Sequence, residues 1–186
     1  MTRWATARRA AALFAADPCA LGGLRVVARA GPVRDAFLAL LPPARKLPLG
    51  VGDGALYGEL DLAATLSAGR PVRRAGLLEA PGLLLLPSAE RCAPDLAARL
   101  GMALDRGRHA VVALDEGEGE APPPALLDRL GVVVDLHDVA LADLSEAADP
   151  PAGTPVDDPA RHLAALAGTL GIASLRAPLL ATRAAP

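Results

Sequence analysis

Cysteine, aromatic side chains and long apolar runs are all scarce in this sequence. Its two cysteines, Cys19 and Cys92, stand far apart and form no Cys-x-x-Cys pair, so we expect idle thiols in a reducing cytoplasm and no disulfide framework. Aromatic residues make up 2% of the chain, so the core must be built from Leu, Val and Ala. No apolar run approaches the roughly 20 residues that cross a bilayer. The first apolar stretch ends at Asp17-Pro18, where an export signal would have a small-residue cleavage site.

A charge excess of one sign is also absent. The chain has 19 basic and 21 acidic residues and a formal net charge of -2, so nothing indicates binding to nucleic acid. Its three histidines lack His-Glu-x-x-His spacing and cysteine neighbours, and no zinc site is predicted. The acidic stretch at 114–120 alternates carboxylates with glycines and lacks the ligand pattern of a calcium loop. We therefore predict no bound metal in the chain's own site.

Strand-like and helical patterns alternate along the sequence. Apolar patterning predicts strands at 24–30, 82–86, 109–114 and 131–136. It predicts helices at 5–15, at 32–41, after the cap residue Asp61, at 126–130, and in a segment with Leu96, Leu100, Met102 and Leu104 on or near one side. The uninterrupted run "GLLLLP" is typical of a central strand covered on both faces. This alternation predicts an α/β sandwich with a mostly parallel sheet.

The composition also divides the chain. We predict a core over 1–144, and residues 145–159, "SEAADPPAGTPVDDP", are typical of a linker. The remaining segment, 160–186, begins with a helix to about Leu170 that stops at Gly171, and it is too short to fold as a domain of its own.

The stretch "VVARAGPVRDAF" (26–37) has the frame of a phosphate-binding loop without its chemistry. The intact pattern is G-x-x-x-x-G-K-[ST] between a strand and a helix, and here Ala28, Val33, Arg34 and Asp35 occupy the four fixed positions. An intact loop wraps phosphates with backbone N–H groups, reaches them with lysine and holds Mg²⁺ with a hydroxyl.

Each replacement weakens that chemistry. Gly31 is the only flexible residue left, while Pro32 removes an N–H donor and Val33 is β-branched where the backbone should approach the ligand. Arg34 still has the length to reach a phosphate. Asp35 would set an anion beside it, so we expect Arg34 to pair with Asp35 in place of a ligand, or the two to form an ordinary pair at the start of a helix.

Several blocks in order resemble one family. "DPCALGGLRVVARAGPVRDAFLALLP", the long stretch from "LPLGVGDGALYGELDLAATLSAGRPV" to "GLLLLPSAERCAPDLAARL", "VALDEGEGEAPPPALLDRL" and "LGIASLRAPLLATRAA" are similar to the D subunit of magnesium chelatase, an AAA+ relative. The resemblance covers nearly the whole chain. It implies a P-loop NTPase (AAA+-like) three-layer core and makes 160–186 the start of a helical lid.

The resemblance also locates a second defect. Pro87 and Ser88 stand where the family's ATPase subunit carries an acidic pair that binds Mg²⁺, and neither Glu90 nor Asp95 is in register to replace it. Without metal and positioned charge, phosphoryl transfer loses its main sources of rate. We therefore expect no ATP turnover at the chain's own site.

Two arginines stand at positions where the resemblance implies functional arginines. The resemblance implies that Arg129, in "ALLDRL", is an arginine finger that reaches across a subunit interface, and that Arg176, in "ASLRAPLL", is the lid arginine that contacts nucleotide. A finger supplied in trans raises rates by about 10³–10⁵ in well-studied nucleotide hydrolases. The plain alternative for Arg129 is a solvated ion pair with Asp128.

The partners implied are the ATPase I subunit, arranged in a ring, and the porphyrin-binding H subunit, which together insert Mg²⁺ into protoporphyrin IX for chlorophyll or bacteriochlorophyll synthesis. ATP and Mg²⁺ are then expected at the interface between subunits. Full D subunits continue into an acidic linker and an integrin-like domain, so we expect the 186-residue chain to bind partners without supporting chelation by itself. Two alternatives remain open, namely an active nucleotidase with a displaced site and a degraded AAA+ remnant with a structural role.

Overall fold

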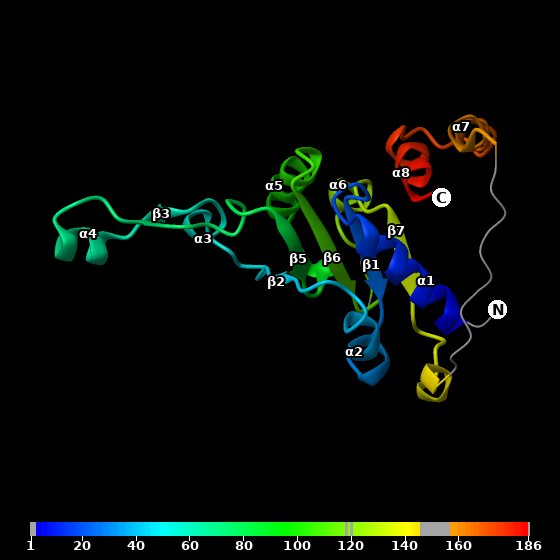
Figure 1. The fold of residues 1–186 in the computed structure, drawn as a ribbon, viewed down its shortest axis with the longest axis horizontal. Coiled ribbons are helices and arrows are strands. Elements are labelled where there is room, and N and C mark those ends of the chain that lie inside the picture. Colours follow the sequence, from blue (N-terminus) through cyan, green and yellow to red (C-terminus); the bar gives the residue numbers. More distant parts are fainter. Residues whose placement is uncertain (1–2, 118, 120, 146–156, 186) are drawn as a thin grey trace.

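A five-stranded parallel sheet lies at the centre of the protein (Figure 1). The computed structural model describes residues 3–117, 119, 121–145 and 157–185. The sheet order is β2-β5-β6-β1-β7, so β1 lies between two strands that follow it much later in the chain. The strands are β1 (Gly23–Val27), β2 (Arg45–Lys46), β5 (Gly82–Leu86), β6 (His109–Asp115) and β7 (Val132–Asp135).

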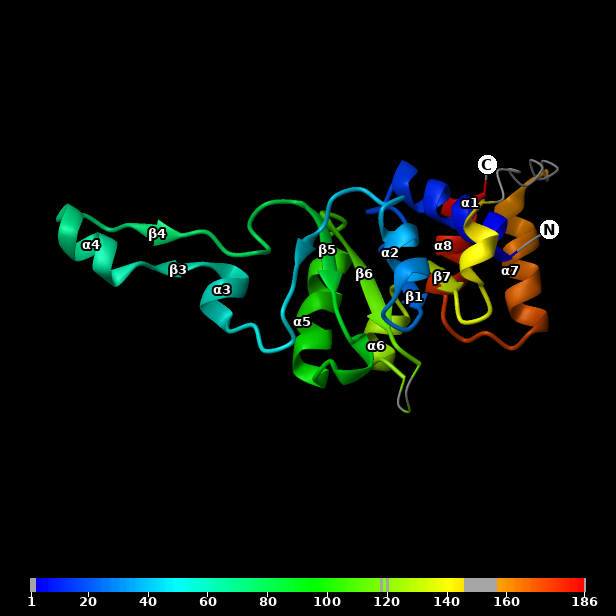
Figure 2. The same ribbon diagram turned by 90° about the horizontal axis from the view of Figure 1, so that it is seen from below.

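Helices cover both faces of this sheet, as Figure 2 shows from below. On one face, α1 (Arg3–Ala16) and α2 (Pro32–Leu38) bury Phe14 and Phe37 against β1. On the other, α5 (Pro94–Asp105) and α6 (Pro124–Leu127) bury Leu100 and Leu126 against β5 and β6. The three-layer α/β sandwich predicted from the sequence is confirmed.

The leucine run of β5 explains why this strand is central. Successive side chains of a strand point to opposite faces, and here Leu83 joins the core under α1 while Leu84 and Leu86 join the core under α5. Every residue of β6 is buried. These two strands therefore fix the middle of the sheet and set where the carboxyl ends of its strands meet.

Residues 53–74 form an arm that extends away from the sheet (Figure 1). It contains α3 (Asp53–Tyr57), α4 (Leu62–Ala68) and an antiparallel pair of two-residue strands, β3 (Glu59–Leu60) and β4 (Arg73–Arg74). The predicted cap is confirmed, because the Asp61 side chain accepts a hydrogen bond from the Ala64 N–H at 3.0 Å. No residue of α4 is buried.

Two helices follow the core. They are α7 (Pro159–Thr169) and α8 (Arg176–Ala184), and Gly171, with a φ of 68°, follows the first helix as predicted. Helix α8 lies against the start of β7, where a Cβ on Gly131 would come within 3.3 Å of the Leu180 Cβ. Most of the predicted linker, residues 146–156, lies outside the described residues, so the predicted division into core, linker and lid stays a prediction.

Some sequence-based details were wrong. Met102 is 61% exposed, whereas Leu96, Leu100 and Leu104 are buried, because a residue two positions along a helix lies about 200° around its axis. Helix α2 ends at Leu38, three residues before the predicted end at Leu41. Helix α6 begins two residues before the predicted 126–130 segment, because Pro124 is suited to a first helical turn. The remaining short elements are 3₁₀ turns, η1 (Ala89–Arg91) and η2 (Leu141–Ser145).

Candidate functional site

The degenerate loop lies where the sequence predicts it, between β1 and α2. A hollow of about 200 Å³ is lined by residues 28–34 together with Leu136 and His137. That volume is below the roughly 300–1,000 Å³ of ordinary small-molecule sites. Ala28 is buried, and its N–H donates a hydrogen bond to the Asp115 carbonyl of β6 at 2.8 Å. Val33 is partly buried against the core.

Arg34, at the position of the loop lysine, has a partner that the sequence did not suggest. Its Nη1 lies 3.5 Å from the Glu116 Oε1, just beyond β6, and its side chain is 16% exposed. Its Nε is buried and has no hydrogen-bond partner in the described part of the chain. Asp35 is exposed in the first turn of α2, and the described residues contain no ion pair between it and Arg34. The expected Arg34–Asp35 pair is therefore wrong, because the side chain of Arg34 turns inward to the sheet edge.

A second carboxylate reaches the same edge. Pro87 and Ser88 directly follow β5, as predicted, and Ser88 has the left-handed backbone values φ 46° and ψ 55°. The turn η1 then returns Glu90 to the sheet, where its Oε2 accepts the Glu116 N–H at 3.4 Å. The Glu90 side chain is only 5% exposed.

Sequence reasoning missed this cluster of acids. Glu116 follows a buried parallel strand, and the carboxyl ends of parallel strands meet at one edge; that signal was available. Glu90 gives no such signal, because η1 determines its direction. At this edge Arg34 pairs with Glu116, and the Glu90 carboxylate lies beside Glu116, an arrangement suited to an internal ion pair and unsuited to a polyphosphate. No group of three or more His, Cys, Asp or Glu residues within the described ranges is placed to hold a metal ion.

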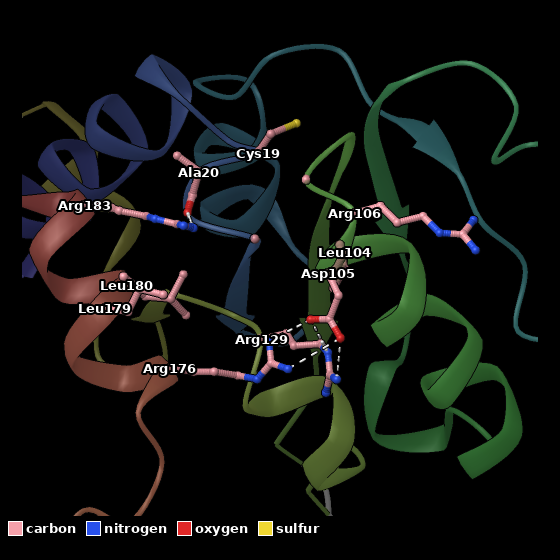
Figure 3. A pocket seen from close by; sticks show the side chains of 12 residues that line it. Cys19, Ala20, Leu104, Asp105, Arg106, Arg129, Arg176, Leu179, Leu180 and Arg183 are labelled. Carbon is pink, nitrogen blue, oxygen red and sulfur yellow. Dashed lines mark hydrogen bonds and ion pairs between the residues drawn. The ribbon is translucent and has the colours of Figure 1, made fainter.

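Arg129 and Arg176 meet on another side of the molecule, around one carboxylate (Figure 3). Arg129 follows α6, Arg176 begins α8 and Asp105 ends α5. Arg129 donates from Nε and Nη2 to the two Asp105 oxygens at 3.0 and 2.7 Å. Arg176 donates from Nη1 to Asp105 Oδ1 at 2.6 Å. The hydrogen bond from Arg129, with further help from Arg176, holds the pKa of Asp105 below its ordinary value.

The predicted ion pair of Arg129 with Asp128 takes a different form. Asp128 accepts from Ser174 Oγ at 2.6 Å and pairs with Arg176 Nε at 3.0 Å, while the carboxylate that binds Arg129 is Asp105. Arg129 is one-fifth exposed, so the pair is more than a fully solvated surface contact.

These arginines line an open hollow of about 330 Å³. Among the described residues that line it, the charged ones are Arg106, Arg129, Arg176, Arg183 and Asp105, and Asp128 pairs with Arg176 beside it. A hollow with four guanidinium groups and one carboxylate attracts anions, and guanidinium groups bind phosphate oxygens in pairs. The structure does not bring Arg176 to the loop at 28–35, so its role in contacting nucleotide stays a prediction.

Both thiols are free: Cys92 is buried and Cys19 is half-buried at the rim of this hollow. Burial raises the pKa of each thiol above its ordinary value, which disfavours the reactive thiolate.

None of the described helices is both long and apolar enough to cross a membrane.

Comparisons with known proteins give one consistent result. The sequence matches no protein-family profile. It is 46% identical over 197 residues to the magnesium-chelatase 60 kDa subunit of Rhodobacter capsulatus, a match that covers 96% of this chain and 35% of that protein. The corresponding subunit of Cereibacter sphaeroides is also 46% identical, over 98% of this chain and 36% of its own length. A magnesium-chelatase 67 kDa subunit of Chlorobaculum parvum is 31% identical over 69% of this chain.

The chain thus spans about a third of the length of the curated relatives that it matches most fully. Among solved structures, it resembles a chain from a complex of the BchI and BchD subunits of magnesium chelatase, which was built from a cryo-EM reconstruction. The TM-score is 0.51 at 19% identity, with 95% of this chain and 71% of that chain covered. This likeness supports the same α/β fold, and the predicted α/β class with a mostly parallel sheet is confirmed.

Proposed function

We propose that this chain, a homologue of magnesium-chelatase 60 kDa subunits, forms a non-hydrolysing AAA+ platform that completes the ATP site of a neighbouring I subunit. One observation carries the proposal: the arginine at the loop-lysine position is paired inside the chain, whereas Arg129 and Arg176 gather in an open, positively charged hollow. The first arrangement leaves the chain without a working phosphate site. The second gives it a surface suited to phosphate on another subunit.

The chain's own site lacks each part of a hydrolytic centre. A phosphate would have to displace Glu116 from Arg34 and approach the partly buried Glu90. Pro87 and Ser88 offer no carboxylate for Mg²⁺ at the tip of β5. Since phosphoryl transfer depends on neutralising the charge of the phosphates, these residues do not support turnover at the chain's own site.

The hollow around Arg129 has the charge for the complementary role. An arginine that reaches a neighbour's γ-phosphate stabilises charge in the transition state and raises the rate by about 10³–10⁵. ATP and Mg²⁺ would then lie at the interface, bound mainly by the I subunit. We extend the proposal to the whole assembly, in which the I and H subunits and this protein insert Mg²⁺ into protoporphyrin IX.

The test is to mix the purified chain with I subunits and ATP, and to measure association and ATPase rate. We expect the mixture to hydrolyse ATP faster than the I subunits alone, and we call this difference the excess rate. Arg129→Ala should abolish the excess rate while co-elution with I subunits at micromolar concentration is kept. Arg74→Ala is the matched control, because Arg74 is also paired with carboxylates but lies on the arm.

Measurements on the chain with and without I subunits separate the alternatives. ATP hydrolysis by the isolated chain that is lost in Arg34→Ala would favour the displaced-site nucleotidase. Failure to bind either nucleotide or I subunits would favour the degraded remnant. Retention of ATP only in the mixture would support an interfacial site.

A further inference from the structure

The carboxylate of Asp105 lies between two guanidinium groups that come from different parts of the chain (Figure 3). Its Oδ1 accepts from Arg129 Nε at 3.0 Å and from Arg176 Nη1 at 2.6 Å. Its Oδ2 accepts from Arg129 Nη2 at 2.7 Å and from Arg176 Nη2 at 3.4 Å. One side chain at the end of α5 therefore joins the segment after α6 to the start of α8.

We propose that Asp105 is a positioning residue that holds Arg129 and Arg176 side by side, so that both face the same anion of a neighbouring subunit. This inference rests on the proposed function, in which that anion is the phosphate chain of a bound nucleotide. Two guanidinium groups this close repel each other, and a shared carboxylate is the group that keeps them together. Asp105 acts on the rate through Arg129 and Arg176 and has no contact of its own with the reacting atoms.

A glycine of helix α5 leaves room for the side chain of Arg129. Gly101 lies one helical turn before Asp105, on the same face of α5. A Cβ on Gly101 would lie 3.1 Å from the Arg129 Nε and 3.2 Å from its Cζ, so the guanidinium group lies directly over this glycine. The Ala125 carbonyl accepts from Arg129 Nη1 at 2.7 Å and fixes the other side of the group.

The contacts leave hydrogen-bonding capacity for a ligand. A guanidinium group has five N–H donors, and the contacts above use three of those on Arg129. Arg176 uses two toward Asp105, and its Nε forms an ion pair with Asp128 at 3.0 Å. Each arginine keeps one N–H on each terminal nitrogen, so both can bind phosphate oxygens without leaving Asp105.

The charge of the cluster agrees with this role. The pKa of Asp105 is lowered mainly by the hydrogen bond from Arg129, so the carboxylate stays ionised at neutral pH. Asp105 and Asp128 together balance the charges of Arg129 and Arg176, so the positive excess of the hollow comes from Arg106 and Arg183 on its wall. The arginines are thus held in place without losing their attraction for an anion.

The experiment uses the full chain mixed with I subunits, and follows kcat and KM for ATP of the excess rate. Asp105→Asn keeps the size of the side chain and removes its charge. We expect kcat to fall about 10- to 100-fold, the range that follows misplacement of a group by about 1 Å, while KM and the Kd for I subunits change less than about twofold. Asp105→Glu should recover part of kcat. Gly101→Ala, which leaves all charges in place and crowds Arg129, should also lower kcat.

Two controls separate positioning from a general structural effect. Asp95→Asn removes another α5 carboxylate that pairs with an arginine, Arg99 at 2.9 Å, and should leave kcat unchanged. Asp105→Asn added to the Arg129→Ala/Arg176→Ala chain should leave the Kd for I subunits unchanged, because a positioning residue has nothing left to position.

The outcomes are distinct. If Arg129→Ala lowers the excess rate but Asp105→Asn leaves kcat within twofold of the wild type, the inference is overturned and the proposed function stands. A weaker Kd for I subunits when Asp105→Asn is added to the Arg129→Ala/Arg176→Ala chain would also overturn it, since Asp105 would then act by another route. If Arg129→Ala has no effect, the proposed function fails and the inference fails with it.

Discussion

The ion pair at the end of β6 offers a sharp test of how the sheet edge is held. Asp115 is 1% exposed, and its Oδ2 accepts from the Arg25 Nε and Nη2 of the adjacent strand at 2.8 and 2.5 Å. Its Oδ1 accepts the Gly117 N–H at 2.9 Å and so shapes the chain beside Glu116. Removal of Asp115 therefore leaves a cation and a backbone donor without their acceptor.

The magnitude follows from the unequal burial of the two partners. Removal of one member of a buried ion pair typically costs about 3–5 kcal/mol. The Arg25 side chain is 25% exposed and can recover some hydration, so we expect Asp115→Ala to cost about 3 kcal/mol, at the lower end of that range. For a chain of this size, that loss lowers Tm by about 6–12 °C. Asp115→Asn keeps the bond to Gly117 and should cost about 1.5–3 kcal/mol, the value of hydrogen bonds to charged groups.

Urea unfolding measures these values. The single tryptophan, Trp4, is buried under the sheet, so its fluorescence reports the loss of the core. The double variant Arg25→Met/Asp115→Leu should unfold within about 1 kcal/mol of the wild type, because an apolar pair of similar volume carries no desolvation penalty. A cost below about 1 kcal/mol for Asp115→Ala, or a double variant less stable than Asp115→Ala, would refute the reasoning.

Two further predictions concern other buried or strained residues. His109 is 4% exposed, and burial together with Arg45, Arg108 and Arg106 lowers its pKa; the unfolded chain therefore takes up this proton first as the pH falls below about 6.5. The contribution of neutral His109 to the free energy of unfolding should be fully present above that pH and decline on acidification, by at most about 1.4 kcal/mol per pH unit. In urea unfolding from pH 7.5 to 5, the free energy of unfolding should fall less steeply with acidification in His109→Leu than in the wild type. Equal slopes would contradict this. Ser88→Gly should raise stability by about 0.5–1 kcal/mol, since it relieves a left-handed backbone at some cost in chain entropy. Ser88→Ala should show no such gain, and equal stabilities of the two variants would count against backbone strain at this site.

Local pattern was sufficient for most of the architecture. The β5 leucines identified a central strand because both of its faces are covered, and Asp61 identified a helix start because a cap is a contact within four residues. The two-residue strands of the arm escaped notice, since β3 and β4 are too short to show any period. Met102 was misplaced because the helix position was judged from spacing without a full account of its 100° step.

Residue chemistry likewise located the defects of the loop but not their consequence. Spacing along the chain predicted that Ala28, Val33, Arg34 and Asp35 stand at the fixed positions of a phosphate loop, and the family resemblance predicted that Pro87 and Ser88 stand in place of an acidic pair. It also placed Arg129 and Arg176 in segments similar to a known family. The sequence indicated that Glu116 ends a strand at the sheet edge, but it did not identify the carboxylates that pair with Arg34, Arg129 and Arg176. Glu116 meets Arg34 through the alignment of parallel strands, and Asp105 meets Arg129 and Arg176 across 24 and 71 residues.

The difference between what local sequence predicts and what tertiary packing decides has a physical cause. Helix and strand formation, capping and the loss of a phosphate loop depend on neighbours within a few residues, so the order of amino acids determined them. Which carboxylate neutralises which guanidinium depends on how β1, β6, α5 and α8 pack, and packing brings together residues that no local pattern relates. Only the tertiary structure could therefore decide that Arg34 is paired within the sheet edge, while Arg129 and Arg176 share Asp105 in an open hollow.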